Sequence, residues 1–170
     1  MKKEPDHVYA EDSGRGYRRM VPSPKPVDII EKESILNLLD NEFIVIACGG
    51  GGIPVVERPD GTLEGVAAVI DKDFAAELLA EQVDADTLMI LTEVEKVAVN
   101  WGKPDQKSLE EMSIAEAEKY IGENQFAPGS MLPKVQAAIA FARSGGRAII
   151  ADLHNAALAL EGKSGTAIHK

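Results

Sequence analysis

The sequence predicts an α/β fold, a three-layer αβα sandwich with a mainly parallel sheet. Short β-branched runs alternate with segments of helical periodicity, a rhythm that is typical of βαβ units. Aromatic residues make up only 5% of the 170 residues and hydrophobic residues 45%, so the core must consist mainly of Ala, Val, Ile and Leu. That composition suits a sheet covered by helices better than an aromatic-rich β-sandwich.

The first elements follow from local patterns. Residues 1–26 are polar, contain several prolines and glycines, and predict an extended leading segment before a domain over residues 27–170. The spacing of apolar residues predicts a helix over 27–39. The β-branched run at 43–48 predicts a buried strand, and Cys48 at its end is interpreted as a small buried hydrophobic residue rather than a nucleophile.

The rest of the domain continues the alternation. An Asp-Gly pair at residues 60 and 61 predicts a tight turn in a small β-hairpin over 53–66. Ser113 and Glu116 form the capping-box pattern that starts a helix. Further strands are predicted over 87–92, 97–99, 147–151 and 165–168, and further helices over 73–82, 133–142 and 155–160.

The bulk composition excludes several classes of function. The formal net charge is −10, whereas proteins that bind nucleic acid need clustered Lys and Arg. The single cysteine rules out an internal disulfide, and the scattered histidines lack the spacing of a metal site. The apolar runs are too short to span a bilayer and no signal-peptide pattern is found, so a cytoplasmic protein is expected.

Four consecutive glycines, Gly49, Gly50, Gly51 and Gly52, directly follow the predicted strand at 43–48. Glycine lets backbone N–H groups approach an anion without interference from side chains. The pattern is neither a P-loop nor a dinucleotide fingerprint. It predicts either an anion-binding loop or a structural turn.

A lysine stands between two aspartates, in the order Asp71, Lys72 and Asp73, where a helix is predicted to begin. Either aspartate could cap the helix, because carboxylates accept hydrogen bonds from its first N–H groups. Alternatively, Lys72 is a cation positioned for phosphoryl oxygens, since a helix N-terminus favours anions. The spacing alone is compatible with both interpretations.

A second lysine, Lys134, falls in the first turn of a predicted helix. It follows a loop that contains Pro128, Gly129 and Met131. A cation in the first turn opposes the helix dipole, so this lysine is not placed for helix stability. The pattern therefore favours a functional role over that of a solvated surface lysine.

The end of a predicted strand offers a further candidate site. Ligands of open parallel sheets bind where the strands end, although an ordinary exposed loop would look the same in sequence. The candidates are Leu91, Thr92, Glu93, Val94 and Val97. Trp101, slightly further on, fits packing or a pocket wall better than a catalytic role.

Taken in order, these segments resemble the amino acid kinase superfamily and, within it, the carbamate kinases. The similar segments are 11–24, 49–55, 69–75, 91–92, 102–104, 126–134 and 160–163. They extend over nearly the whole chain. Each segment alone is a weak signal, and their combination in this order is a strong one.

The resemblance implies the reaction ATP + carbamate = ADP + carbamoyl phosphate, with Mg²⁺ accompanying the nucleotide. Lys72 and Lys134 match the cations that neutralise the transferring phosphoryl group, and Asp73 matches the carboxylate that orients them. The glycine loop would cradle carbamate and the phosphoryl group, while residues 91–97 and 128–131 would surround adenine and ribose. We expect Lys134→Ala to leave folding intact and to reduce turnover by orders of magnitude.

The chain departs from the family pattern in its extent. Family members are substantially longer, and nothing here matches their initial strand, their Gly-Gly-Asn loop or their lid subdomain with another lysine. Residues 1–26 match the end of that region. We therefore expect the N-terminal half to be absent, as in a truncated, split or degenerate form. A sheet edge or an apolar surface is expected to be exposed unless a partner covers it.

The resemblance also predicts the partners. They are carbamate or carbamoyl phosphate, an adenine nucleotide, a separate chain carrying the N-terminal half, and further copies of this chain. Two rival functions stay open. One is a related kinase acting on a carboxylate such as N-acetylglutamate or aspartate, although the basic segment at 15–19 and Lys72 between two aspartates favour carbamate. The other is a catalytically inactive nucleotide-binding or assembly module.

Overall fold

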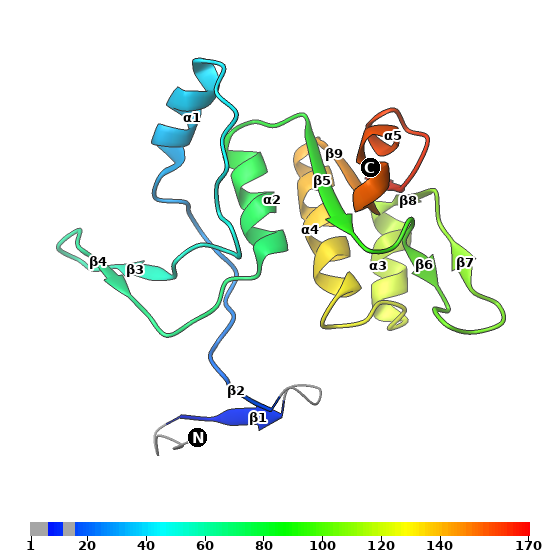
Figure 1. The fold of residues 1–170 in the computed structure, drawn as a ribbon, viewed down its shortest axis with the longest axis horizontal. Helices are drawn as coiled ribbons and strands as arrows, with labels where there is room; N and C mark the ends of the chain where they lie inside the picture. The colour runs from blue at the N-terminus through cyan, green and yellow to red at the C-terminus, as the bar shows by residue number, and fades with distance from the viewer. Residues whose placement is uncertain (1–6, 12–15) are drawn as a thin grey trace.

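A four-stranded sheet forms the centre of the computed structural model, which describes residues 7–11 and 16–170 (Figure 1). Its strand order is β5 (Thr87–Thr92), β9 (Arg147–Asp152), β10 (Thr166–His169) and β8 (Glu111–Ser113). β9 is parallel to β5 and β8 is parallel to β10, whereas β10 is antiparallel to β9. The sheet is therefore mainly parallel, as predicted.

Helices cover both faces of the sheet, but unequally. One face carries α2 (Lys72–Gln82), α3 (Ile114–Gly122) and α4 (Met131–Ser144), and the other carries α5 (Ala156–Leu160) after the 3₁₀ turn η1 (Leu153–Asn155). Alternate residues of β9 mark the two faces. Ile150 packs in the main core with the larger helices, whereas Ile149 packs with Ala159 of α5. The predicted αβα sandwich is confirmed. None of the helices in the described residues is long and apolar enough to cross a membrane.

The helix ends are set by local sequence. The side chain of Asp71 accepts a hydrogen bond from the backbone N–H of Asp73 and so caps α2. Ser113 and Glu116 form the predicted capping box at the start of α3. Gly145 ends α4 with a left-handed φ of 110°, a conformation that glycine adopts without a steric cost.

Three two-stranded hairpins lie outside the main sheet. They are β1 (Tyr9–Glu11) with β2 (Tyr17–Arg19), β3 (Val55–Glu57) with β4 (Leu63–Gly65), and β6 (Ala98–Val99) with β7 (Lys107–Ser108). The β3–β4 hairpin turns at Asp60 and Gly61, as predicted. The β1–β2 hairpin lies within the predicted leading segment, and Arg15 of the basic segment lies outside the described residues. The domain boundary after residue 26 stays a prediction.

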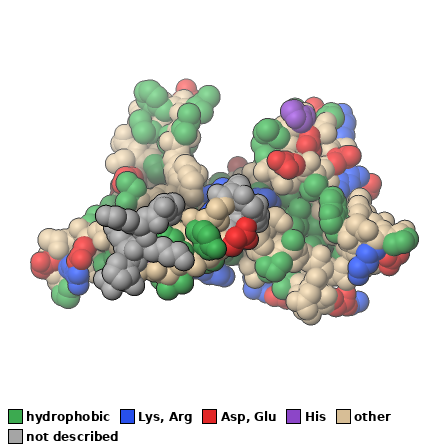
Figure 2. Space-filling view, turned by 60° about the horizontal axis from the view of Figure 1, so that its bottom comes forward, with side chains coloured by type: hydrophobic (Ala, Val, Ile, Leu, Met, Phe, Trp, Pro, Cys, Tyr) green, Lys and Arg blue, Asp and Glu red, His purple; other side chains and the backbone are tan. Residues whose placement is uncertain are grey.

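The predicted buried strand at 43–48 is wrong. The segment forms no strand, and Ile44 and Ile46 are each 97% exposed. It follows α1 (Lys32–Asp40), a helix that begins five residues later than predicted. Hydrophobic side chains are visible on the lobe that carries α1, which stands apart from the sheet (Figure 2). A β-branched run becomes a buried strand only beside a neighbouring strand, and the described residues provide none here.

Cys48, at the end of this run, is half-buried rather than buried. It adopts a left-handed φ of 59° just before the glycines. Partial burial, with a smaller contribution from the negative charge of Glu31, raises the pKa of the Cys48 thiol. A raised pKa lowers the fraction of reactive thiolate, which agrees with the interpretation that this cysteine is not a nucleophile.

Candidate active site

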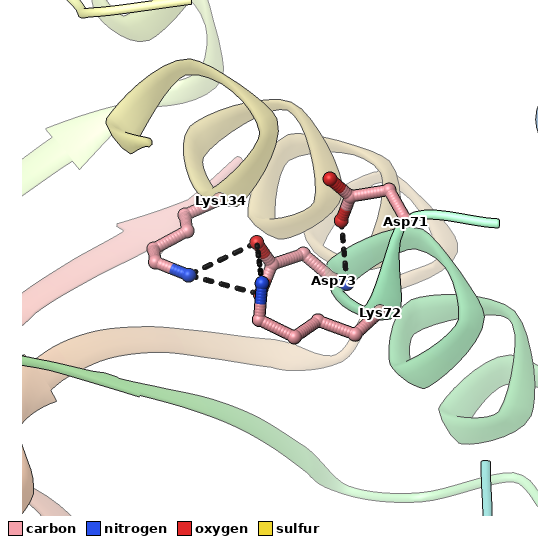
Figure 3. Close-up of polar contacts among 4 residues, drawn as sticks. All are labelled: Asp71, Lys72, Asp73 and Lys134. Atoms are coloured by element: carbon pink, nitrogen blue, oxygen red, sulfur yellow. Dashed lines mark hydrogen bonds and ion pairs between the residues drawn. The ribbon is translucent and has the colours of Figure 1, made fainter. Parts of the chain in front are cut away.

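Two lysines from different helices meet on one carboxylate (Figure 3). Lys134 Nζ donates to both carboxylate oxygens of Asp73, at 3.1 and 3.0 Å. Lys72 Nζ lies 4.0 Å from Asp73 Oδ2. Residues that are 61 positions apart in the sequence are therefore brought together by the packing of α2 against α4.

The two lysines differ in their exposure to solvent. Asp73 and Lys134 are buried, with only 5% and 9% of their surfaces exposed, whereas the side chain of Lys72 is 60% exposed. Two buried charges can persist only as a close pair, because an isolated charge would be strongly disfavoured. Lys134 thus forms a buried ion pair, and Lys72 presents a more exposed cation at the surface beside it.

The structure separates the two roles that the sequence left open for the aspartates. Asp71 is the cap of α2, whereas Asp73 uses its carboxylate to hold the lysines. Asp73 lies in the first turn of α2, where a negative charge is favoured by the helix dipole. It also compensates for Lys134, whose positive charge lies unfavourably in the first turn of α4.

The glycine loop at 49–52 approaches the start of α2. Gly51 is buried with a φ of 128°, and a Cβ atom built on it would lie 2.0 Å from the carbonyl oxygen of Ile70. The N–H of Gly51 also donates to the carbonyl of Cys48 at 2.8 Å, so the loop contains a tight turn. Only glycine fits this contact, which places the loop against the residue that directly precedes Asp71.

A hollow of about 410 Å³ opens beside the first turn of α4. Of the residues predicted to bind nucleotide, Thr92, Glu93, Val94, Pro128 and Met131 line it. Lys96 and Ser130, which fall within the predicted ranges 91–97 and 128–131, line it too, as do residues outside those ranges: Ala98, Trp101, Asn124, Gln125, Phe126 and Ala127. Its size and its mixture of apolar walls with a few polar groups suit a small organic ligand.

Three of the predicted nucleotide-binding residues do not line this hollow. Val97 is fully buried in the core, where its side chain packs with the sheet. Gly129 is an exposed residue between two lining residues. Leu91 lines a neighbouring hollow of about 470 Å³, which is formed with Thr92, Glu93, Asp152, Leu153 and His154. Thr92 and Glu93 line both, so the two hollows adjoin at the end of β5.

Trp101 and Gln125 belong to loops that sequence periodicity does not describe. Trp101 is 61% exposed and lines the 410 Å³ hollow, a position that agrees with the interpretation as packing or pocket wall. The side-chain carbonyl of Gln125 accepts from the backbone N–H of Asn100 at 2.8 Å. This bond fixes the turn that carries Trp101. In the sequence, the only sign of this part of the hollow is an isolated tryptophan in a polar turn.

No group of three or more His, Cys, Asp or Glu side chains within residues 7–11 and 16–170 is arranged to hold a metal. Two carboxylates stand at the start of α2: Asp73, which holds the lysines, and Asp71, which caps the helix (Figure 3). One or two carboxylates suffice for Mg²⁺ when phosphate oxygens and water supply the remaining ligands.

Residues 3–152 match the sequence profile of the amino acid kinase family. The chain belongs to this family. It is 63% identical over 172 residues to a carbamate kinase of Clostridium perfringens, covering 100% of this chain and 54% of that protein. It is 56% identical to a carbamate kinase of Oenococcus oeni, covering 98% and 53%. The chain thus spans about half the length of the curated relatives it matches.

Solved structures agree with this membership. A carbamate kinase from Giardia lamblia bound to AMP-PNP superposes with a TM-score of 0.91 at 47% identity, covering 98% of this chain and 52% of the other. UMP kinase from Bacillus anthracis superposes less closely, with a TM-score of 0.55 at 19% identity, and shows the shared fold alone. The amino acid kinase fold expected from the sequence is confirmed.

Proposed function

We propose that this chain is the nucleotide-binding half of a carbamate kinase, which transfers a phosphoryl group reversibly between ATP and carbamate. One observation carries the proposal. The first turn of α4 provides both Met131, which lines the hollow, and Lys134, which meets Lys72 on Asp73. A nucleotide in the hollow would therefore have its phosphates within reach of a pair of cations.

The chemistry of phosphoryl transfer fits this arrangement. Such transfer depends on alignment and charge neutralisation more than on covalent catalysis. Lys134, held rigidly by Asp73, would stabilise charge on the transferring group, and Lys72 would add a second cation from the more exposed side. Mg²⁺ bound with the nucleotide would supply further positive charge at its phosphates. The glycine loop, fixed against Ile70, would present backbone N–H groups to carbamate or phosphoryl oxygens.

The adenine and ribose would occupy the hollow at the end of β5. Thr92, Glu93 and Val94 would contact them from one side, and Pro128 and Met131 from the other. Trp101 adds an aromatic wall, and Lys96 is the only cation among the described residues that line this hollow. Gly129, Leu91 and Val97 do not line the hollow, and we propose that they shape its walls as neighbours of the lining residues.

We further propose that the exposed apolar segment is covered by a separate chain that carries the other half of the family's length. The support is the exposed fraction of Ile44 and Ile46, together with the half-length match to the relatives. Two stretches of backbone lack a strand partner among the described residues: residues 43–48, which form no strand, and the outer side of β5, which lies at an edge of the sheet. The assembly of further copies and the cytoplasmic location stay predictions.

The same exposed segment supports one rival function, that of an inactive nucleotide-binding module. A chain that binds nucleotide without turnover would have the hollow and the ion pair but would lack part of the site. Calorimetry with ADP and Mg²⁺ tests nucleotide binding, which both functions share. Saturable binding by the 170-residue chain supports the nucleotide site, whereas no heat of binding at millimolar ADP would refute it.

Activity requires a second experiment. The chain is co-expressed with the part of the C. perfringens relative that it does not match, and ATP formation from ADP and carbamoyl phosphate is measured. ATP formation by the purified complex supports a split carbamate kinase. A complex that forms without turnover supports the inactive module. Phosphorylation of N-acetylglutamate or aspartate in preference to carbamate would identify the related carboxylate kinase instead.

A further inference from the structure

A buried hydroxyl group joins three segments of the chain behind the hollow. Thr166, the first residue of β10, is 0% exposed. Its Oγ1 accepts a hydrogen bond from the backbone N–H of Val97 at 2.8 Å and donates one to the carbonyl of Leu109 at 2.6 Å. A hydroxyl group is suited to this position because it can accept and donate at the same time.

The segments that Thr166 joins are also linked to each other. The N–H of Leu109 donates to the carbonyl of Val97 at 2.8 Å. The N–H of Ala167 donates to the carbonyl of Glu110 at 2.9 Å, and the side chain of Glu110 pairs with Lys96 at 3.0 Å. Residues 96–97, 109–110 and 166–167 therefore form one connected network of hydrogen bonds.

This network has a direct relation to the hollow. Thr92, Glu93, Val94 and Lys96 line the hollow, and Val97 is the next residue of the chain. Val97 is fully buried, so its backbone is the point at which this wall is attached to the sheet. The conformation of residues 93–96 is thus limited at one end by β5 and at the other by the bond to Thr166.

We infer that Thr166 is a positioning residue for the nucleotide wall at residues 93–96. It does not contact the ligand and acts through the backbone N–H of Val97. The inference rests on the proposed nucleotide site. Thr166 is far in sequence from the residues that line this site. Without the hydroxyl, the N–H of Val97 would be buried with its hydrogen bond broken, and the wall would shift to recover a partner.

The test compares Thr166→Val with Thr166→Ser in the full chain. Valine has nearly the same shape as threonine but neither donates nor accepts, whereas serine keeps the hydroxyl and loses a methyl group. We expect Thr166→Val to weaken ADP–Mg²⁺ binding about tenfold, since loss of one buried hydrogen bond has effects of this order. Thr166→Ser should stay within about twofold of the unsubstituted chain.

Ile168→Val is the matched control, because Ile168 lies on the same strand and is also 0% exposed. It removes a core methyl group without touching the network, so it should lower the melting temperature and leave the dissociation constant unchanged. Hydrogen exchange of the Val97 amide is measured for all variants. Faster exchange together with weaker binding in Thr166→Val alone supports the inference.

Three results would overturn it, and they are distinguishable. If the unsubstituted chain binds ADP and Thr166→Val binds it equally well, Thr166 is merely structural and the nucleotide site stands. If the unsubstituted chain binds no ADP, the nucleotide site itself is refuted and the positioning role falls with it. Equal weakening in Thr166→Val and Ile168→Val would also count against the inference, because general destabilisation would then explain the loss.

Discussion

Two parts of this chain use similar apolar segments with opposite results. The body, residues 71–169, buries its β-branched runs in a sheet covered by helices. The arm, residues 27–70, comprises α1, the run at 43–48 and the β3–β4 hairpin, and leaves most of its large apolar side chains exposed. Ile150 in the body is 0% exposed and Ile44 in the arm is 97% exposed. Local sequence sets the tendency to form a strand, and neighbouring strands determine whether one forms.

The largest effect is expected at the ion pair of the body. Removal of one partner from a buried pair leaves a charge uncompensated, so Lys134→Ala should lower the free energy of unfolding by about 3–5 kcal/mol. The burial of Lys134 thus revises the expectation that this substitution leaves folding intact. Lys72→Ala removes an exposed cation and should cost less than about 1 kcal/mol. Urea denaturation of both variants measures the difference.

A double variant separates charge from packing in this experiment. Asp73→Leu combined with Lys134→Met replaces the pair with apolar side chains and should recover much of the lost stability. If the double variant is as unstable as Lys134→Ala, uncompensated charge is not the cause. In a catalytically active complex, either lysine substitution should raise the barrier by about 2–4 kcal/mol, since under the proposed function each removes a group that would stabilise developing charge.

The body and the arm can be compared directly with one substitution in each. Ile150→Ala creates a cavity in the main core and should cost about 2–5 kcal/mol of unfolding free energy. Ile44→Ala removes a solvent-exposed side chain and should change stability by less than about 0.5 kcal/mol. Thermal unfolding of the two variants provides the measurement. A large loss in Ile44→Ala for the isolated chain would show that the arm is packed in solution.

A contact within the arm, directly before the start of the body, is tested by two adjacent glycines. Gly51→Ala would force alanine into a left-handed φ and would place its Cβ atom against the carbonyl of Ile70. It should therefore lower the free energy of unfolding by about 1–3 kcal/mol. At Gly50 a Cβ atom would meet nothing within 4 Å, and Gly50→Ala should be within about 0.5 kcal/mol of the unsubstituted chain. ADP binding is measured alongside, since a displaced loop would disturb the start of α2. Equal behaviour of the two variants would contradict the described loop.

The smallest effect is expected at Glu77 of α2, and it depends on pH. Burial, reinforced by the nearby charge of Glu81 and opposed by Lys25, raises the pKa of Glu77 from 4.5 to about 7. A raised carboxyl pKa means that the folded chain binds the proton more tightly than the unfolded chain. Its stabilising contribution is therefore present below pH 4.5 and is lost as the pH rises to about 7.

Glu77→Gln removes this dependence. The variant should exceed the unsubstituted chain in melting temperature at about pH 8, and the difference should nearly vanish at about pH 5. The change in free energy should stay under about 1 kcal/mol, because partial exposure screens the charges. Melting curves at both pH values provide the measurement. A difference that is constant with pH would show that Glu77 titrates normally.

The accuracy of the sequence predictions differs between these parts of the chain for physical reasons. β5 was predicted with its observed bounds, and β9 to within one residue, because their apolar runs pack against the covering helices, where burial and pattern agree. β8 was missed because Glu111–Ser113 is a short, polar edge strand that leaves little periodicity. The run at 43–48 was predicted wrongly because its pattern carries no information about whether a neighbour is present.

The site shows the same limit. Lys134 was recognised because its charge opposes a helix dipole, a conflict that is visible in the sequence. Its ion pair with Asp73 agrees with the relation that the resemblance implied, and the catalytic role of both residues stays a prediction. The contributions of Trp101 and Gln125 depend on how loops fold over the hollow, which periodicity cannot describe. Thr166 was missed for the same reason, since its partners lie 69 and 57 residues away.

The position of β10 has a consequence for how the chain is made. β10 is synthesised after β8 and β9, yet it lies between them and pairs with both. β8 and β9 therefore emerge from the ribosome before β10, the strand that pairs with both, has been synthesised. Until residues 166–169 emerge, β8 and β9 have no direct bond to each other, and their unpaired edges are open to other chains. Closure of the sheet is thus a late event in biogenesis, at which a chaperone would have the most to protect.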